Sequence, residues 1–147
     1  MGERKGMAGT SSGEPKQLPR CISIVICNEV IEDKQTSNKT LVSLFNQIDA
    51  TTLPSRHARM FVVASLTDGL GKCPITIRVA SLKSDREIAR VEGEAEFQDP
   101  LAVLDFVVEL RSLPLFEEGV HAVDVIADGN LLSTRRFFVR LVGGHQQ

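Results

Sequence analysis

The sequence of 147 residues predicts one all-β domain, an antiparallel β-sandwich of seven to eight strands. Apolar and polar residues alternate with a period of two in several short segments, as half-buried strands require. Turn residues such as Gly, Pro, Asp and Asn separate these segments every 10 to 15 residues or so, and no segment has a convincing helical period. Strands with one apolar face need a second sheet to cover it, which favours a sandwich. A barrel closed from the same strands is the alternative.

The first half of the domain is predicted to contain four strands. The first is apolar on both faces, which is typical of a strand that lies centrally in a sheet. Pro54 interrupts the connection between the second and third strands. The fourth alternates, with Ile75, Ile77 and Val79 on one face. The predicted strands are residues 21–27, 40–48, 59–66 and 75–79, and the connection is residues 49–58.

Residues 89–98 show the clearest alternation in the chain. Apolar residues at odd positions face the core, while glutamates at even positions face water. A helix would scatter these glutamates around its circumference. The next strand, residues 102–111, has its apolar residues at even positions. A helix over residues 101–113 is its alternative, but a period of two fits better.

The last two segments are predicted to form a β-hairpin, because alternating runs flank the turn signal Asp128-Gly129. Odd positions carry the apolar face in both runs, including Leu131 and Phe137 in the second. Pairing odd positions with odd positions requires an odd loop length. We therefore expect a three-residue loop, residues 128–130, or a bulge near Arg135, rather than a two-residue turn.

The chain is predicted to consist of a domain between two short tails. Residues 1–20 are rich in Gly, Ser, Lys and Glu, which predicts a disordered or loosely packed tail. Residues 21–142 carry the strand pattern and form the β-sandwich domain. Residues 143–147 are predicted to be a flexible C-terminus.

Composition and charge indicate a cytoplasmic protein that binds neither nucleic acid nor membrane. The formal net charge of −2 is unlike that of a general nucleic-acid binder. No apolar run approaches the roughly 20 residues that span a bilayer, and the N-terminus lacks the apolar segment of a secretory signal. The three cysteines are odd in number, and Cys21 and Cys27 lie too far apart along one strand to form a disulfide.

Several segments follow one another in a characteristic order along the chain. They are the strands at 21–30 and 39–48, the Leu53-Pro54 connection, and Glu117-Glu118-Gly119 before the last hairpin. In this order the chain resembles a bacterial family of uncharacterised proteins. The resemblance covers roughly residues 21–142, the whole domain, and implies an immunoglobulin-like β-sandwich with no catalytic residue. The family usually has Tyr at the position of His121. The hydrogen bond of a tyrosine corner is therefore lost here or is made by the imidazole.

The motifs of common enzymes and metal sites are missing from the sequence, so we expect no catalytic activity. There is no Gly-x-Ser-x-Gly nucleophile elbow and no Gly-rich phosphate loop. The three histidines, His57, His121 and His145, lack the spacing of zinc ligands. The sequence predicts neither a metal nor any other cofactor.

The last strand carries the predicted interaction surface. Phe137 belongs to the core face, which leaves Phe138 facing outward between Arg136 and Arg140. Aromatic residues and arginines are enriched at interface centres. We therefore expect a protein-interaction or assembly module whose partner is another protein or a second copy of the chain, joined by edge or face packing.

A small-ligand or anion-binding β-sandwich protein is the alternative function. Arg56 and His57 lie in the connection before the third strand and Arg59 begins that strand; together they could hold a phosphate or a carboxylate. This alternative requires a concave pocket at that segment, whereas an ordinary solvated turn would leave it flat.

Overall fold

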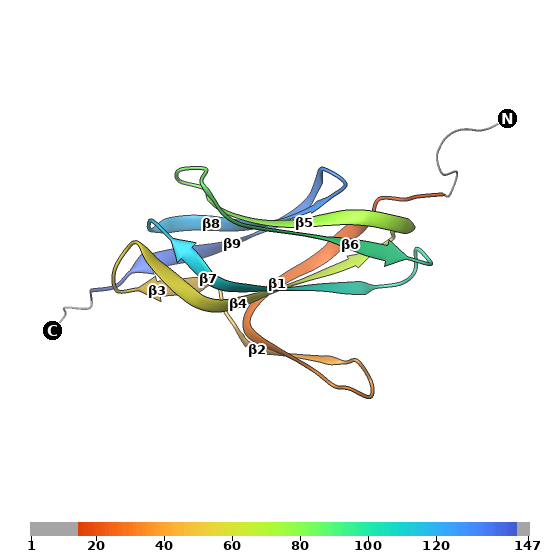
Figure 1. Cartoon of the computed structure of the whole chain (residues 1–147), viewed down its shortest axis with the longest axis horizontal. Coiled ribbons are helices and arrows are strands. Elements are labelled where there is room, and N and C mark those ends of the chain that lie inside the picture. The colour runs from red at the N-terminus through yellow and green to blue at the C-terminus, as the bar shows by residue number, and fades with distance from the viewer. Residues whose placement is uncertain (1–14, 144–147) are drawn as a thin grey trace.

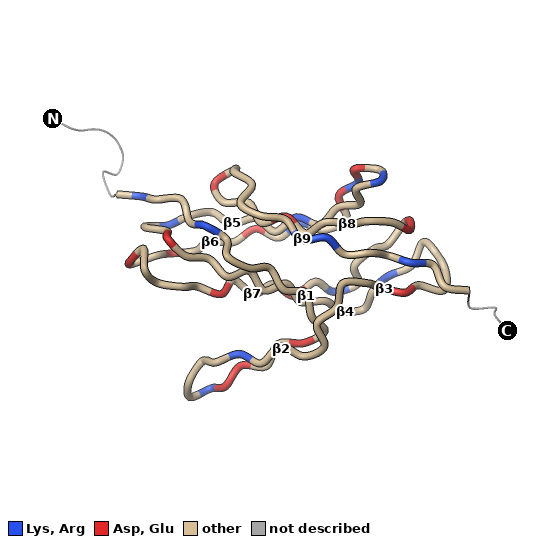
Figure 2. Tube along the Cα trace, turned by 180° about the vertical axis from the view of Figure 1, so that it is seen from behind, with Lys and Arg blue, Asp and Glu red and all other residues tan. Residues whose placement is uncertain are grey.

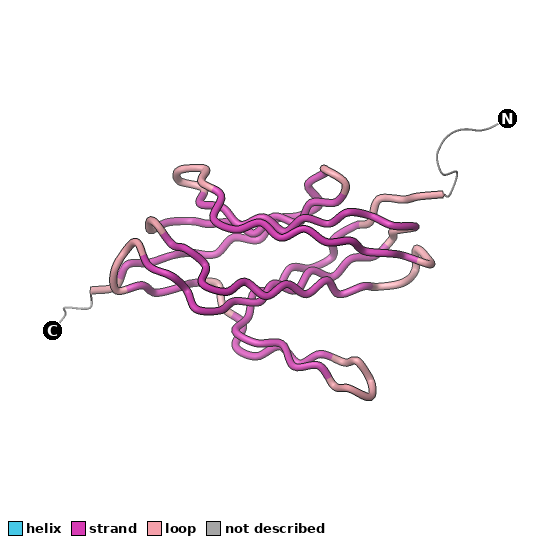
Figure 3. The backbone as a smooth tube through the Cα atoms, viewed as in Figure 1, coloured by secondary structure: helices cyan, strands magenta, loops and turns pink. Residues whose placement is uncertain are grey.

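The computed structural model describes residues 15–143, and within this range it contains nine strands and no helix (Figure 3). The all-β class is therefore confirmed, whereas the predicted number of seven to eight strands is wrong and the parallel pairing of the third and ninth strands departs from the predicted antiparallel arrangement. The strands are β1 (Arg20–Glu32), β2 (Lys39–Leu44), β3 (Gln47–Ala50), β4 (Ser55–Thr67), β5 (Gly71–Ser81), β6 (Glu87–Phe97), β7 (Leu104–Leu115), β8 (Gly119–Ala127) and β9 (Asn130–Leu141).

The strands form two sheets that face each other (Figure 1). The four-stranded sheet has the order β2-β1-β4-β7, and the five-stranded sheet has the order β3-β9-β8-β5-β6. All neighbouring strands are antiparallel except β3 and β9, which are parallel. The core between the sheets takes side chains from both, and fully buried examples are Ile26, Met60, Val62, Leu66, Ile75, Ile77, Val79, Val123 and Phe137. Burying each such side chain contributes about 1.5–3 kcal/mol, so this layer holds the sheets together.

Strands with clear alternation lie as predicted. Ile75, Ile77 and Val79 of β5 are all buried. On β6, Ala95 and Phe97 are buried while the glutamates between and before them are exposed. The helix considered for residues 101–113 is absent, since β7 occupies this segment.

The predicted second strand, residues 40–48, is wrong because the chain changes sheets within it. β2 ends at Leu44, close to Ser43, whose φ of 58° bends the backbone. The amide of Phe45 still donates to the carbonyl of Ile26 in the four-stranded sheet, but β3 then pairs with β9 in the other sheet. The run of strand-forming residues continues through the crossing, so local sequence does not reveal it.

The predicted connection at residues 49–58 is also wrong, because β4 begins at Ser55 and pairs with an extended β7. His57 lies opposite Leu113 of β7. Ser112 has a φ of 52°, and the buried face of β7 changes there from even to odd positions. The buried leucines beyond it, Leu113 and Leu115, are each about 1% exposed.

The β8–β9 hairpin has a two-residue turn, not the predicted three-residue loop. Asp128 and Gly129 both have positive φ (49° and 81°), as a type I′ turn requires, and Ala127 pairs with Asn130. The predicted odd-with-odd pairing is nevertheless restored further along by a bulge at Leu132, not near Arg135. As a result, Leu131 is 62% exposed and Leu132 packs against the core.

The first predicted tail, residues 1–20, is described only from residue 15. Gln17 forms a backbone bridge with Leu70, at N···O distances of 3.0 and 3.1 Å in the two directions. Arg20 opens β1 and its guanidinium lies 3.0 Å from the carboxylate of Asp68. Residues 1–14 and 144–147, which include most of both predicted tails, lie outside the described range. No helix in residues 15–143 is long and apolar enough to cross a membrane.

Arg135 links the two sheets. Its guanidinium donates through Nη1 to the carbonyl of Ile24 on β1 (2.7 Å) and through Nη2 to Oδ1 of Asn46, at the point where the chain crosses between the sheets. Hydrogen bonds from a charged donor are stronger than neutral ones, particularly where water has restricted access.

The two neighbouring leucines of β9 provide a test of the register. Replacing half-buried Leu132 with Ala removes core contacts, so we expect a loss of about 1–2 kcal/mol in the free energy of unfolding. Leu131→Ala removes mostly exposed atoms and should change stability by no more than about 0.5 kcal/mol. Urea denaturation of both variants measures the difference, and a larger loss for Leu131→Ala would contradict the bulge at Leu132.

Arg135→Gln tests the link between the sheets. We expect a loss of about 1–3 kcal/mol in the free energy of unfolding, because the variant leaves an acceptor at Ile24 without its charged donor. The matched control is Arg136→Gln, one residue along and exposed, with an expected change within about 0.5 kcal/mol. Equal losses in the two variants, measured by urea denaturation, would show that the link contributes nothing.

Candidate functional site

The structure places Arg136, Phe138 and Arg140 on one face of β9. All three are exposed, and the exposed fraction of Phe138 is 44%. β9 is not an open edge here, because Gln47 of β3 lies opposite Phe138. The guanidinium of Arg140 contacts the carboxylate of Asp49 on β3, with Nε 3.3 Å from Oδ1. The outer face of the sheet is therefore the accessible part of the predicted surface at these residues.

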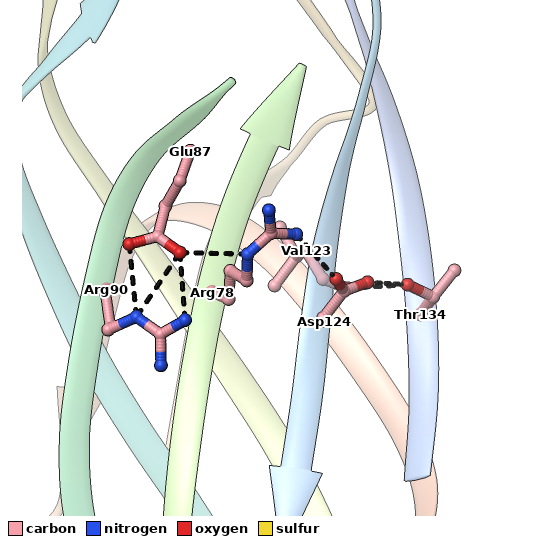
Figure 4. A network of polar contacts seen from close by, with 6 residues as sticks. All are labelled: Arg78, Glu87, Arg90, Val123, Asp124 and Thr134. Atoms are coloured by element: carbon pink, nitrogen blue, oxygen red, sulfur yellow. Dashed lines mark hydrogen bonds and ion pairs between the residues drawn. The ribbon is translucent and has the colours of Figure 1, made fainter. Parts of the chain in front are cut away.

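A chain of ion pairs crosses the same sheet beside this surface (Figure 4). Glu87 accepts from Arg78 and Arg90, with each shortest N···O distance at 2.9 Å. Arg78 also reaches Asp124 at 3.4 Å, and Asp124 accepts a hydrogen bond from Thr134. The hydrogen bond from Arg90, followed by that from Arg78, keeps the pKa of Glu87 below its ordinary value. The charges of this network compensate one another, so this part of the face is not a free site for an ion.

The three residues of the predicted anion site do not converge on one point. Arg56 donates through Nη1 to the carbonyl of Ser112 (2.8 Å). Arg59 forms an ion pair with Glu109 (Nε–Oε2 2.8 Å) and its guanidinium carbon lies 4.9 Å from the centre of the Phe61 ring. Both guanidinium groups therefore have partners within the protein.

His57 lies between two small hollows beside β3. A hollow of about 210 Å³ is lined by His57 and Arg56, and a second of about 240 Å³ is lined by His57 and Phe45. Asp49 lines both. The imidazole lies 5.8 Å from the Phe45 ring, and its buried Nε2 has no hydrogen-bond partner among the described residues. Burial lowers the pKa of His57, an effect that a hydrogen bond with the backbone at Arg59 partly opposes.

His121, at the predicted corner position, is fully buried. Its Nδ1 lies 3.0 Å from the carbonyl of Gly119, two residues earlier, within hydrogen-bond distance. The ring packs against Phe137, with centroids 5.2 Å apart. Its Nε2 and the Oγ of the neighbouring Ser81 have no hydrogen-bond partner among the described residues. The arrangement fastens the start of β8 to the core.

A third hollow, which no pattern in the sequence predicted, lies between the β1–β2 hairpin and the outer face of the four-stranded sheet. Its volume is about 550 Å³. The sheet contributes Val63, Ser65 and Asp105, and the hairpin contributes Lys39 and Leu41. It forms because the hairpin leaves the sheet, a long-range arrangement that alternation of residues does not encode.

The cysteines and acidic residues do not form a metal site. Within residues 15–143, no three His, Cys, Asp or Glu side chains lie together as metal ligands would. Cys21, Cys27 and Cys73 are free thiols, and burial raises the pKa of each.

The fold and its candidate sites thus define an all-β domain with an exposed phenylalanine on β9 and several hollows at its surface. The chain belongs to a family of unknown function (DUF6941), whose model matches residues 22–140. No curated protein matches the sequence.

Among solved structures, part of a β-glucosidase from Listeria innocua in complex with glucose is similar, with 12% identity and a TM-score of 0.50 over 90% of this chain. Another is the Pseudomonas fluorescens alkylpurine DNA glycosylase AlkC bound to DNA containing an abasic site analog, with 13% identity and a TM-score of 0.49 over 83% of this chain. The matched regions cover only 17% of the glucosidase chain and 30% of the glycosylase chain. The glucosidase match shows a similar fold and nothing about activity.

The pH dependence of stability tests the buried position of His57. The pKa of His57 is lower in the folded protein than its unfolded value of about 6.5. Burial of the neutral ring therefore makes its full contribution to the free energy of unfolding only above the unfolded pKa. This contribution is lost as the pH falls through the lower, folded pKa. We expect the wild type to lose more stability than His57→Gln between pH 7.5 and pH 5.5, as measured by urea denaturation at both pH values. Parallel losses would mean that His57 titrates as it does in water.

Proposed function

We propose that this chain is a non-catalytic protein-interaction or assembly module with an immunoglobulin-like β-sandwich fold. The sheet orders β1-β4-β7 and β9-β8-β5-β6 support the fold, because they follow the A-B-E and G-F-C-C′ orders of immunoglobulin domains. The additional β2 and the parallel β3 are departures from the basic pattern. A cytoplasmic location is part of the proposal and is supported by three free cysteines.

The exposed ring of Phe138 between two arginines is the observation that carries the proposed function. Large apolar side chains on a protein surface are common singly, but an aromatic residue flanked by arginines is typical of interface centres. Val120 on β8 lies opposite Phe138 and is half-buried, so it extends the apolar area. Because β3 occupies the edge of β9 at this point, a partner would pack on the face. We propose a second copy of the chain, related by a two-fold axis, as that partner.

The absence of catalysis in this proposal is supported by the surroundings of the two described histidines. Neither His57 nor His121 has a hydrogen-bond partner at Nε2 among the described residues. A general base must come within hydrogen-bond reach of the reacting group. His121 is fully buried and the Nε2 of His57 is buried, which counts against that role for either ring.

A small-ligand or anion-binding protein is the alternative function. The 210 Å³ hollow supports it, since Arg56 and His57 both line this space. The hydrogen bond from Arg56 to Ser112 and the ion pair of Arg59 with Glu109 count against it, because an anion would have to displace them. The lowered pKa of His57 also favours the neutral ring, which attracts an anion less.

Phe138→Ser tests the proposed interface. We expect the wild-type protein to sediment as a dimer at micromolar concentration and Phe138→Ser to sediment as a monomer, because hot-spot aromatic residues contribute about 2 kcal/mol or more. Leu131→Ser on the same strand is the matched control. Its side chain is more exposed, at 62%, and it should leave the dimer intact. A dimer that survives Phe138→Ser, or a monomeric wild type, would exclude this face as a self-interface.

A further inference from the structure

The β1–β2 hairpin leaves the body of the domain as a two-stranded ribbon. β1 pairs with β4 as far as Cys27, and beyond that point it pairs only with β2. Figures 1 and 2 show the ribbon below the four-stranded sheet, with its tip apart from the other strands. β2 is the last strand of its sheet, so the outward backbone groups of Lys39–Leu44 have no strand partner among the described residues. A two-stranded hairpin is marginally stable alone, and an added strand stabilises it.

The outer face of the four-stranded sheet is apolar where the ribbon lies opposite it. Val25, Val63 and Val107 stand side by side across β1, β4 and β7. Val63 is only 5% exposed, although it belongs to the side of the sheet that faces away from the core. The outer side of an antiparallel sheet is usually polar. Leu41 of β2 lines the same hollow as Val25 and Val63, so apolar groups are present on both walls.

A polar row with one uncompensated charge lies beside the valines. Ser23, Ser65 and Asp105 occupy adjacent positions on the three strands, and Ser65 donates to Oδ1 of Asp105 (2.7 Å). Asp105 has no ion pair among the described residues. Lys39, the cation in the opposite wall, lies 3.7 Å from Glu32, which offsets its charge. The hollow thus combines hydroxyl groups, aliphatic side chains and a carboxylate that has no ion pair among the described residues.

We propose that this hollow binds an extended peptide segment of a partner protein that presents a lysine or arginine side chain. The aliphatic stem of that side chain would lie on Val25 and Val63, and its cationic group would reach Asp105. The peptide backbone would pair with the outward groups of β2, as in other cases of strand addition. The volume of about 550 Å³ is within the range of ligand sites. The inference rests on the proposed interaction function but uses a different surface from Phe138.

Selection from a displayed library of random heptapeptides tests the proposal on the full chain. The wild type should enrich peptides with Lys or Arg at one fixed position beside apolar or β-branched residues. Asp105→Lys should lose these peptides and enrich Asp or Glu at that position. Glu94→Lys, the same charge change at an exposed position of β6, should keep the wild-type selection. Peptides without a fixed basic residue, no enrichment by the wild type, or a selection unchanged by Asp105→Lys would each overturn the proposal.

Two further variants keep the outcome interpretable. Asp105→Asn has nearly the same shape, so it separates loss of charge from loss of folding. It should weaken binding of the selected peptide about tenfold or more in fluorescence anisotropy, because a hydrogen bond between charged groups is stronger than one to a neutral amide. An unchanged affinity would contradict the role of Asp105. Phe138→Ser should select the same peptides as the wild type, so a failed dimer interface and a failed peptide site are distinguished.

Discussion

The crossing of the chain from one sheet to the other at Asn46 is the constraint on which the rest of the structure depends. The carbonyl of Asn46 accepts the amide of Phe138 at 2.8 Å, and its side-chain oxygen accepts from Arg135. Arg135 also binds the carbonyl of Ile24 in the opposite sheet. One short segment is thus tied to β1 and β9 at once. β3 follows directly and brings Ile48 and Ala50 into the buried layer.

The candidate sites follow from this crossing. Because β3 covers the end of β9, Phe138 is accessible through the face of the sheet and not through its edge. Because β3 lies beside the start of β4, His57 is enclosed next to Ile48 and Asp49. The crossing also means that β2 stays with β1 as a separate ribbon, and this ribbon forms the hollow against the outer face of the four-stranded sheet to which both strands belong.

Local alternation was enough to predict the all-β class, the buried faces of β5 and β6 and the odd-with-odd pairing of the last hairpin. The misplaced elements have a common physical cause. Ser43 and Ser112 adopt positive φ without being glycine, and each marks a point where a strand ends or its buried face changes. Residue type does not predict positive φ at these two serines, because strand partners far along the chain stabilise this conformation. The bulge at Leu132 adds one residue to β9 and so compensates for the two-residue turn. The odd-with-odd pairing of β8 and β9 was therefore predictable, although the turn and the bulge that produce it were not.

Of the candidate sites, the sequence predicted the orientation of Arg136, Phe138 and Arg140, since period two fixes faces within one strand. It did not reveal that Arg56 and Arg59 have partners within the protein. Those partners, Ser112 and Glu109, come from β7, some fifty residues later. The hollow at Asp105 was equally hidden, because its walls come from three strands and a ribbon that lie together only in the folded chain.

Amide hydrogen exchange at Phe138 and Val142 of the unmodified protein tests most directly whether the chain crosses at Asn46 and pairs β3 with β9. Their amides donate to the carbonyls of Asn46 and Ala50, both at 2.8 Å. If β3 crosses and covers β9, both amides exchange as slowly as those of the neighbouring β8, because exchange then requires opening of the sheet. Exchange at the rate of a free strand edge would contradict the crossing, and with it the placement of the Phe138 face and of the hollow beneath the hairpin.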